Sequence, residues 1–174
     1  MHKTPMLQTP TRSGGFSLLE VLIALVILSV GLLGIAAMLS TTVKSNDSAY
    51  MRSQATSLAY NVIDRMRANQ NAAQNGDYDI AIGTAAPGSS TICNGALANC
   101  SATTLADFDL TQWKQALASS ANGLPAGDGS IAVNSVAGVF TVTVTVQWND
   151  SRALHSLGGS AAPSLSSLAV SSVF

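Results

Sequence analysis

A long uncharged apolar run near the N-terminus limits the fold of this chain more than any other feature. The run extends from Phe16 to Leu39, and 19 of its 24 residues are apolar. No residue from Val21 to Val43 carries a charge. At 1.5 Å per helical residue, this run covers about 36 Å, which is enough to cross a hydrocarbon core of about 30 Å. We therefore expect a transmembrane helix over residues 16–39, with a buried core helix as the weaker alternative.

The segment before this run has the composition of a cytoplasmic leader. Residues 1–15 contain His2, Lys3 and Arg12 but no acidic residue, and such a positive balance favours retention on the cytoplasmic side. The small residues Ser13 to Gly15 stand before the apolar run, whereas an ordinary secretory signal has its cleavage site after it. Cleavage here would leave the apolar helix on the mature protein.

The composition excludes several classes of function. Only 10% of the residues are charged, 5% are aromatic and the formal net charge is −1. The chain therefore has neither a basic surface for nucleic acid nor an aromatic platform for stacking bases. Two cysteines and two histidines leave little material for a structural zinc site.

The sequence also lacks the common signatures of catalysis. It contains no HExxH, GxSxG, P-loop or GxGxxG motif. His2 lies in the leader and His155 in a loop rich in Ser and Gly. We expect no catalytic residue, no metal and no cofactor. Turn and cap roles fit the acidic residues better than calcium binding does; these residues are Asp77, Asp79, Asp107, Asp109 and Asp128.

The junction between leader and apolar run carries the most specific motif. It reads Gly14-Gly15-Phe16-Ser17-Leu18-Leu19-Glu20-Val21 and resembles the class III leader of type IV pilins and of type II secretion pseudopilins. The resemblance implies that a membrane prepilin peptidase cuts after Gly15 and N-methylates Phe16.

Glu20 matches the acidic residue of that family, five positions into the mature chain. At the centre of a membrane-spanning helix such an acid costs about 2.5–3.5 kcal/mol, although Glu20 lies near the helix start and its positive dipole end. We expect Glu20 to form an assembly salt bridge with the terminal amine of a neighbouring subunit. The alternative is an acid that simply lies at the level of the lipid headgroups.

The helix is expected to continue beyond the membrane. Apolar residues recur there at helical spacing, namely Met51, Ala55, Leu58, Val62 and Met66. No proline interrupts residues 16–73, and Asn75-Gly76 is a stop signal. The predicted helix is 58 residues long, about 87 Å. Gly31 and Gly34 inside it permit either close helix packing or local unwinding, and the sequence does not choose between them.

Cys93 and Cys100 lie in a loop-like stretch from Gly76 to Thr104. An exported head domain would meet an oxidising compartment, so we predict a disulfide between them. A loop this short gives about 2–3 kcal/mol of stabilisation on a chain-entropy estimate. Two free thiols are the alternative.

The remainder of the chain indicates one short helix and three strands. Asp109 or Thr111 is expected to cap a helix over residues 110–120, with Trp113 and Leu117 on its inner face. Strands are expected over residues 130–136, 139–147 and 168–174. Residues 137–138 would form the turn between the first two strands, residues 122–129 a connector, and residues 156–167 an irregular segment.

These elements predict an α+β protein, with a long N-terminal helix packed on a small antiparallel sheet, as in the type IV pilin fold. Residues 1–15 would be the prepilin leader and residues 16–39 the transmembrane or filament-core helix. Residues 40–75 would be the part of the same helix within the head domain, and residues 76–174 the globular head.

Softer motifs narrow the resemblance to minor pilins of the PilV type. They are Ala59–Asn69, Trp113, Leu124–Gly127 and the strand that ends Gln147-Trp148-Asn149-Asp150. The resemblance implies a role in priming pilus assembly and in the tip complex, and so in pilus biogenesis, twitching motility and adhesion. An I-type minor pseudopilin of type II secretion is the alternative, and a membrane-anchored binding protein that does not polymerise is the second.

The same resemblance implies the partners and the location of the protein. The partners are prepilin peptidase, the major pilin and other minor pilins, the inner-membrane assembly platform and a large tip adhesin; nucleic acid is not among them. Before assembly the chain would cross the inner membrane once, with a cytoplasmic leader and a periplasmic head. After assembly it would lie in the extracellular pilus, at the tip.

Overall fold

The computed structural model describes residues 15–88, 91–94, 99–119, 123–150 and 165–174. The chain forms two compact units, Met1–Thr41 and Thr42–Phe174. The described residues of the first unit belong almost entirely to helix α1, which extends over 51 residues from Leu18 to Ala68.

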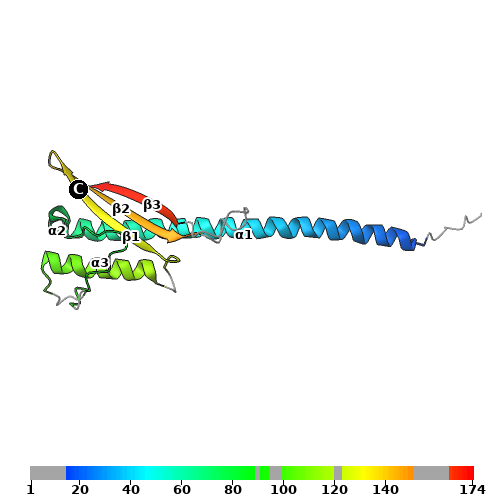
Figure 1. Cartoon of the computed structure of the whole chain (residues 1–174), viewed down its shortest axis with the longest axis horizontal. Coiled ribbons are helices and arrows are strands. Elements are labelled where there is room, and N and C mark those ends of the chain that lie inside the picture. The colour runs from blue at the N-terminus through cyan, green and yellow to red at the C-terminus, as the bar shows by residue number, and fades with distance from the viewer. Residues whose placement is uncertain (1–14, 89–90, 95–98, 120–122, 151–164) are drawn as a thin grey trace, which may run out of the picture. The chain divides into compact units, whose positions relative to one another are not determined.

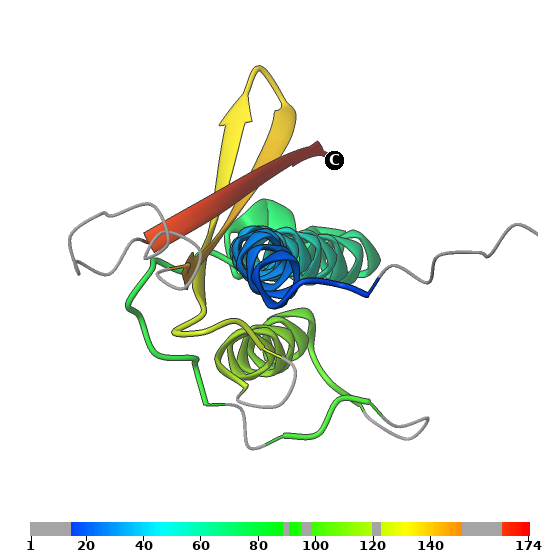
Figure 2. The ribbon, with the colours of Figure 1, turned by 90° about the vertical axis from the view of Figure 1, so that its right-hand side faces the viewer.

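The second unit is an α+β head. Its further helices are α2 (Gln70–Asn75) and α3 (Ala102–Ala118), and its strands are β1 (Asp128–Val136), β2 (Val139–Asn149) and β3 (Leu165–Val173). The strands form an antiparallel sheet in the order β1-β2-β3. Within this unit, α1 lies between the sheet and α3 (Figures 1 and 2). The predicted fold class is therefore confirmed.

The hairpin of β1 and β2 follows the pattern expected from the sequence. Ala137 and Gly138 turn the chain with φ angles of 51° and 82°, as a two-residue hairpin requires. Along β2 every second residue from Val142 to Trp148 is buried, and the intervening threonines are partly exposed. The expected strands are confirmed, and both extend two residues farther from the turn than predicted.

Strand β3 begins three residues earlier than expected, at Leu165. The reason is the length of β2, because Asn149 at its end pairs with Leu165. The prediction of an irregular segment is therefore wrong for residues 165–167, while residues 156–164, like residue 122 of the expected connector, lie outside the described part of the chain.

The core forms where α1 meets the sheet and α3. The predicted stripe on α1 is confirmed, and Leu58 is its partly buried member. Trp113 and Leu117 of α3 are buried as predicted, and the indole Nε1 of Trp113 donates to the carbonyl oxygen of Leu58 at 3.0 Å. A Cβ on Gly129 would lie 2.6 Å from the Trp113 ring, so β1 needs glycine there to approach the indole.

The predicted helix over residues 16–73 is continuous only to Ala68. Asn69 leaves helical geometry, with φ −127° and ψ 54°, and α2 follows it. The buried Asn69 amide donates to the carbonyl oxygen of Ala102 at 2.7 Å, a contact that competes with helix continuation. The predicted stop is confirmed, because Gly76 caps α2 with a φ of 81°.

Helix α3 begins eight residues before the predicted start. Its N-cap is Ser101, whose Oγ accepts from the backbone N–H of Thr104 at 3.1 Å. The prediction that Asp109 or Thr111 caps this helix is therefore wrong, since both lie inside it. The helix ends at Ala118 rather than at Ser120, which lies outside the described residues.

Candidate functional site

The start of α1 arranges the residues of the predicted processing site. Gly15 and Phe16 precede the helix, and Ser17 caps it, because the Ser17 Oγ and carbonyl oxygen both accept from the backbone N–H of Glu20, at 3.2 and 3.1 Å. Glu20 thus lies in the first turn, where a negative charge meets the positive end of the helix dipole. The spacing Ser-x-x-Glu is a capping-box signal that could have identified Ser17 as the cap.

The apolar residues of this unit are open to the surroundings. Phe16 is 83% exposed and Leu18 85% exposed, and every described residue from Gly15 to Val43 is exposed. Helix α1 is long and apolar enough to cross a membrane. An apolar surface of this extent marks contact with lipid or with other protein surfaces.

Glu20 is the one charged residue within this surface. The ion pairs among described residues join Arg65 to Asp109, Arg67 to Asp64, and Lys114 to Asp128; none of them includes Glu20. Helix α1 is continuous through Gly31 and Gly34, and a Cβ at either position would meet no described atom within 4 Å beyond the neighbouring backbone of the same helix.

The head contains a buried polar cluster that sequence reasoning missed. We call Arg65, Asn69, Tyr78 and Asp109 the tyrosine cluster. The Asp109 carboxylate accepts from Arg65 Nη1 at 3.0 Å and from the Tyr78 hydroxyl at 2.8 Å. Asn69 Nδ2 donates to the Tyr78 oxygen at 3.3 Å. Burial, partly offset by the hydrogen bond from Asn69, raises the pKa of Tyr78 far above its usual range, so the hydroxyl stays protonated and acts as a donor.

A second charged contact joins α3 to the start of β1. Lys114 Nζ, which is nearly buried, donates to a carboxylate oxygen of Asp128. Burial opposes ionisation of Asp128, but the hydrogen bonds from Lys114 and from the backbone N–H groups of Gly83 and Gly129 outweigh it. They hold the pKa of Asp128 below its usual range.

Two of the other acidic residues named as calcium candidates, Asp77 and Asp79, have ordinary hydrogen-bond partners. Asp77 accepts from the Thr103 hydroxyl at 3.1 Å, and Asp79 accepts from the backbone N–H of Val133 at 2.9 Å. Across the ranges that the structure describes, no group of three His, Cys, Asp or Glu side chains is arranged to hold a metal. His2 and His155 lie outside those ranges.

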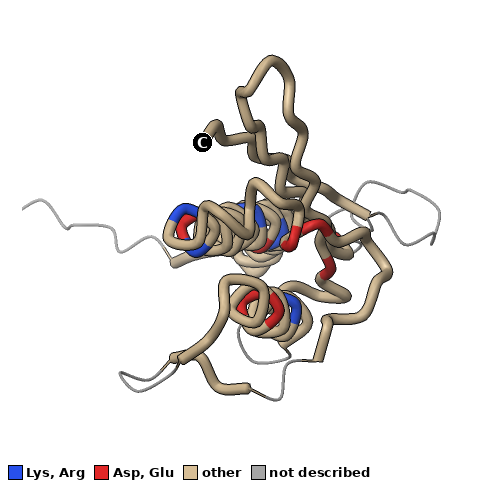
Figure 3. Tube along the Cα trace, turned by 90° about the vertical axis from the view of Figure 1, so that its left-hand side faces the viewer, with Lys and Arg blue, Asp and Glu red and all other residues tan. Residues whose placement is uncertain are grey.

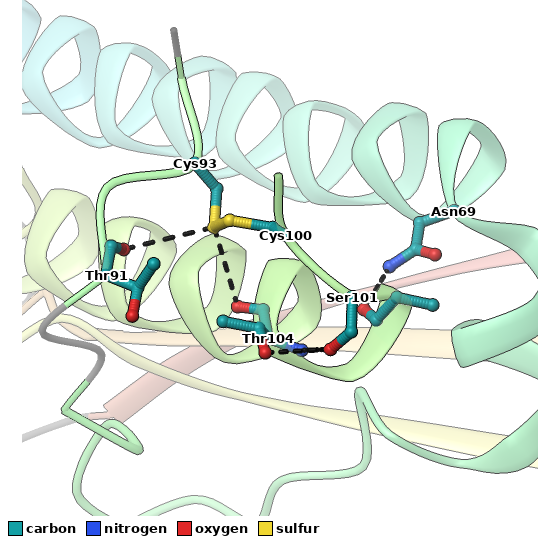
Figure 4. Close-up of a disulfide and its surroundings, with 7 residues drawn as sticks. Asn69, Thr91, Cys93, Cys100, Ser101 and Thr104 are labelled. Carbon is teal, nitrogen blue, oxygen red and sulfur yellow. Dashed lines mark hydrogen bonds between the residues drawn. A yellow bond between two sulfur atoms is a disulfide. The ribbon is translucent and has the colours of Figure 1, made fainter. Parts of the chain in front are cut away.

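A disulfide joins Cys93 and Cys100, with the sulfur atoms 2.05 Å apart (Figure 4). Cys100 directly precedes Ser101, the N-cap of α3, and Cys93 Sγ lies 4.0 Å from the carbonyl oxygen of Thr104 in the first turn. The bond therefore attaches the loop before α3 to the start of that helix.

Comparison with known protein families agrees with this arrangement. Residues 10–36 match the family described as the prokaryotic N-terminal methylation motif, and residues 37–111 match the family described as type IV pilin Tt1218. The two matches follow each other without a gap and cover all of α1, α2 and the first part of α3. No curated protein and no solved structure matches the chain.

The motif and the exposed apolar helix define a membrane-anchored subunit of the kind that is methylated at its N-terminus. The chain is a type IV pilin-like protein. As a pilin, it is processed by prepilin peptidase, associates with the pilus and assembles with other pilins. This is the role of a structural protein rather than of an enzyme.

Proposed function

We propose that this pilin is a minor pilin of the PilV type, which primes pilus assembly and lies in the tip complex with other minor pilins. Contacts with the major pilin, the inner-membrane assembly platform and a large tip adhesin, and roles in twitching motility and adhesion, belong to the same proposal. The residues that resemble PilV-type proteins support it, because Val62, Ile63 and Arg65 from the first of those stretches help to build the head.

The observation that carries the assembly role is the exposed apolar surface that follows the Gly15–Phe16 junction. Prepilin peptidase cuts between these residues and methylates Phe16 in the proposed pathway. The head is then periplasmic, the chain crosses the inner membrane once, and the Cys93–Cys100 bond forms on export. Removal of 15 of the 174 residues, including Lys3 and Arg12, leaves 159 residues with 6 basic and 9 acidic side chains, a formal charge of −3.

Glu20 has a specific place in this proposal. Cleavage frees the amine of Phe16, and methylation leaves it charged. An acid in an apolar helix must find a cationic partner or stay hydrated. Residues 21–43 offer no cation, so we assign Glu20 to a salt bridge with the Phe16 amine of a neighbouring subunit.

The test uses Glu20→Ala as the only copy of the protein. The variant should insert into the membrane at least as well as the wild type, because the cost of burying a charge is gone. It should still lose its leader, giving a chain that begins at Phe16 in mass spectrometry. Its recovery in sheared pili should fall at least about tenfold, because one charge of a buried pair is left without its partner in each contact.

Ser29→Ala is the matched control for Glu20→Ala. The Ser29 hydroxyl also lies in the apolar helix, but it donates to carbonyl oxygens of its own helix, to Leu25 at 2.8 Å and Val26 at 2.9 Å. Its removal should leave recovery in pili unchanged. Wild-type recovery of Glu20→Ala would show that Glu20 is only an interfacial acid.

Deletion of the whole protein separates the competing functions. Loss of pili and twitching with normal type II secretion supports the minor pilin. Lost secretion with normal pili would instead assign the protein to the I-type pseudopilins. If deletion leaves both pili and type II secretion intact, and the processed protein is absent from pili sheared from wild-type cells, the protein would instead be a membrane-anchored binding protein that does not polymerise.

A further inference from the structure

The two edge strands of the head sheet differ in whether their outward backbone groups have hydrogen-bond partners. At the β1 edge, successive backbone N–H groups that point away from β2 have partners. Ile131 exchanges two hydrogen bonds with Ile80, at 2.9 and 3.0 Å, and Val133 donates to the Asp79 carboxylate at 2.9 Å. The N–H of Gly129 donates to the carboxylate of the residue before it at 2.7 Å. This edge is closed to another strand over most of its length.

Among the residues that the structure describes, the outward backbone groups of β3 have no such partners. Phe174 donates to the carbonyl oxygen of Phe140 at 3.0 Å, which fixes the alternation along the antiparallel ladder. Every second residue of β3 therefore directs its N–H and C=O away from β2; these residues are Leu165, Ser167, Ala169, Ser171 and Val173. No other described segment pairs with this edge.

The side chains of β3 do not protect its edge either. Residues 165–174 contain no charged residue and no proline, and the strand shows no acidic or basic position in Figure 3. Sheets usually guard an exposed edge with lysine, proline, a bulge or a covering segment. A nine-residue strand that lacks a charge or a proline is an open template for pairing.

We propose that the β3 edge binds an extended segment of a different pilus protein, which adds a fourth strand to the sheet. This inference rests on the proposed pilus function. Backbone hydrogen bonds would hold the segment, as in other cases of strand addition. Leu168, Val170 and Phe174 lie on the core side of β3 and are only partly buried, so apolar residues at alternate positions of the segment would cover them.

The opposite face of β3 determines which side chains fit at the remaining alternate positions of the partner segment. Ala169 and Ser171 lie there opposite Thr145 and Thr143, and Ser167 lies opposite Gln147. Small, uncharged side chains fit next to this flat row. The partner segment is therefore uncharged and extended, with apolar and small residues in alternation.

A second copy of this chain does not fit as the occupant through antiparallel β3–β3 pairing or through pairing of β3 with β1. Antiparallel pairing of two β3 edges places a two-fold axis perpendicular to the sheet. That axis also reverses α1, which lies along the inner face of the sheet (Figure 2). In two copies anchored in one membrane, α1 begins at the membrane in both, so the two helices run in the same direction. Pairing of β3 with β1 of another copy is blocked because the β1 edge is closed.

The test places a photo-crosslinking amino acid at Ser167 of the full-length protein in piliated cells. Ser135 carries the same probe in a control, because it is an exposed residue of β1 whose backbone also points away from β2. Irradiation should give a discrete adduct from position 167 only. Mass spectrometry should identify an uncharged extended segment of another pilus protein, crosslinked opposite β3.

Ala169→Pro removes one outward N–H without touching the ladder with β2, and Ser135→Pro makes the same change on the β1 edge strand. The adduct should fall about fivefold or more with Ala169→Pro, because a hydrogen bond is lost, and should not change with Ser135→Pro. Ala169→Lys, a charge at the edge, should act like Ala169→Pro without restricting the backbone. Unchanged thermal unfolding of the two Ala169 variants shows that the head is intact.

Several outcomes would overturn the inference. They are a homodimer adduct, an adduct to another part of the same chain, equal yields from positions 167 and 135, or an adduct that survives both Ala169 substitutions. If the protein is present in sheared pili and one of these results is obtained, only the strand-addition inference fails. If the protein is absent from sheared pili, the proposed pilus function fails as well.

Discussion

Replacement of Asp109 by alanine tests whether the tyrosine cluster holds the head together. Asp109 is 6% exposed, and its two oxygens accept from Arg65 and Tyr78. Without the carboxylate, the fully buried Tyr78 hydroxyl keeps only the amide donor of Asn69. The hydroxyl proton then has no acceptor.

The structure sets the size of the effect. A buried donor without a partner costs about 1–3 kcal/mol. Loss of the ion pair adds at most about 1 kcal/mol, because the Arg65 side chain is 35% exposed and water can hydrate it. Asp109→Ala should therefore lower the free energy of unfolding by about 1–4 kcal/mol. For a head of this size, that lowers the Tm by about 10 °C.

The assay is urea unfolding of the full-length protein in detergent, followed by the fluorescence of Trp113 and Trp148, which are both buried. Asp64→Ala is the matched control, because it breaks a pair with Arg67 of nearly the same length, 3.1 Å against 3.0 Å. The Asp64 and Arg67 side chains are 69% and 49% exposed, so this change should cost less than about 0.5 kcal/mol.

A second substitution distinguishes the cost of the unpaired Tyr78 hydroxyl from the cost of the lost ion pair. In Tyr78→Phe no hydroxyl needs an acceptor. The double variant Tyr78→Phe/Asp109→Ala should therefore be at least about 1 kcal/mol more stable than the sum of the two single-variant losses predicts. The reasoning is refuted if Asp109→Ala costs no more than Asp64→Ala, or if the double variant is additive.

Three further predictions concern the remainder of the head. Gly129→Ala should lower the free energy of unfolding by about 1–3 kcal/mol in the same urea assay, because the new methyl group meets the Trp113 ring; unchanged stability would contradict that contact. Asp128 has a folded pKa below its unfolded value of about 3.9, so its stabilisation is present above pH 4 and is lost as the pH falls through the folded value. Thermal melts over a pH series should show a smaller fall in Tm below pH 4 for Asp128→Asn than for the wild type. An equal fall in both proteins would refute this. Replacement of Cys93 and Cys100 by serine should cost about 2–3 kcal/mol and remove the effect of reductant on the melt; a reductant-insensitive wild type would show that the bond is absent.

The parts of the fold that the sequence predicts correctly depend on local periodicity. The alternation of valine and threonine from Val142 to Gln147 requires one buried and one open face, so it predicts the central strand and its orientation. The stripe on α1 likewise predicts which side of the helix enters the core. Ala137-Gly138 predicts the hairpin because few other residue pairs turn a chain in two residues.

The errors arise where distant residues decide local structure. Asn69 breaks the long helix because its amide bonds Ala102, which is 33 residues away. Asp109 looked like a helix cap, but its partners are Tyr78, 31 residues away, and Arg65, 44 residues away. No pattern in the flanking residues carries that information. The cap at Ser101 was missed because the start of α3 lacks a strong apolar period.

The first half of α1 has to suit two environments in turn, and Glu20 distinguishes them. Lipid tails are as apolar as leucine, so hydrophobicity alone gives these helices no reason to leave the bilayer for a filament. If Gly31 and Gly34 serve for close helix packing rather than for local unwinding, that packing would offer one driving force, since no side chain would separate the backbones there. Glu20 offers a larger one under the proposed pairing, because it costs free energy in lipid and is neutralised beside the amine of a neighbour. The same acid that disfavours the membrane would then favour the filament, and transfer would depend on a charge rather than on apolar area.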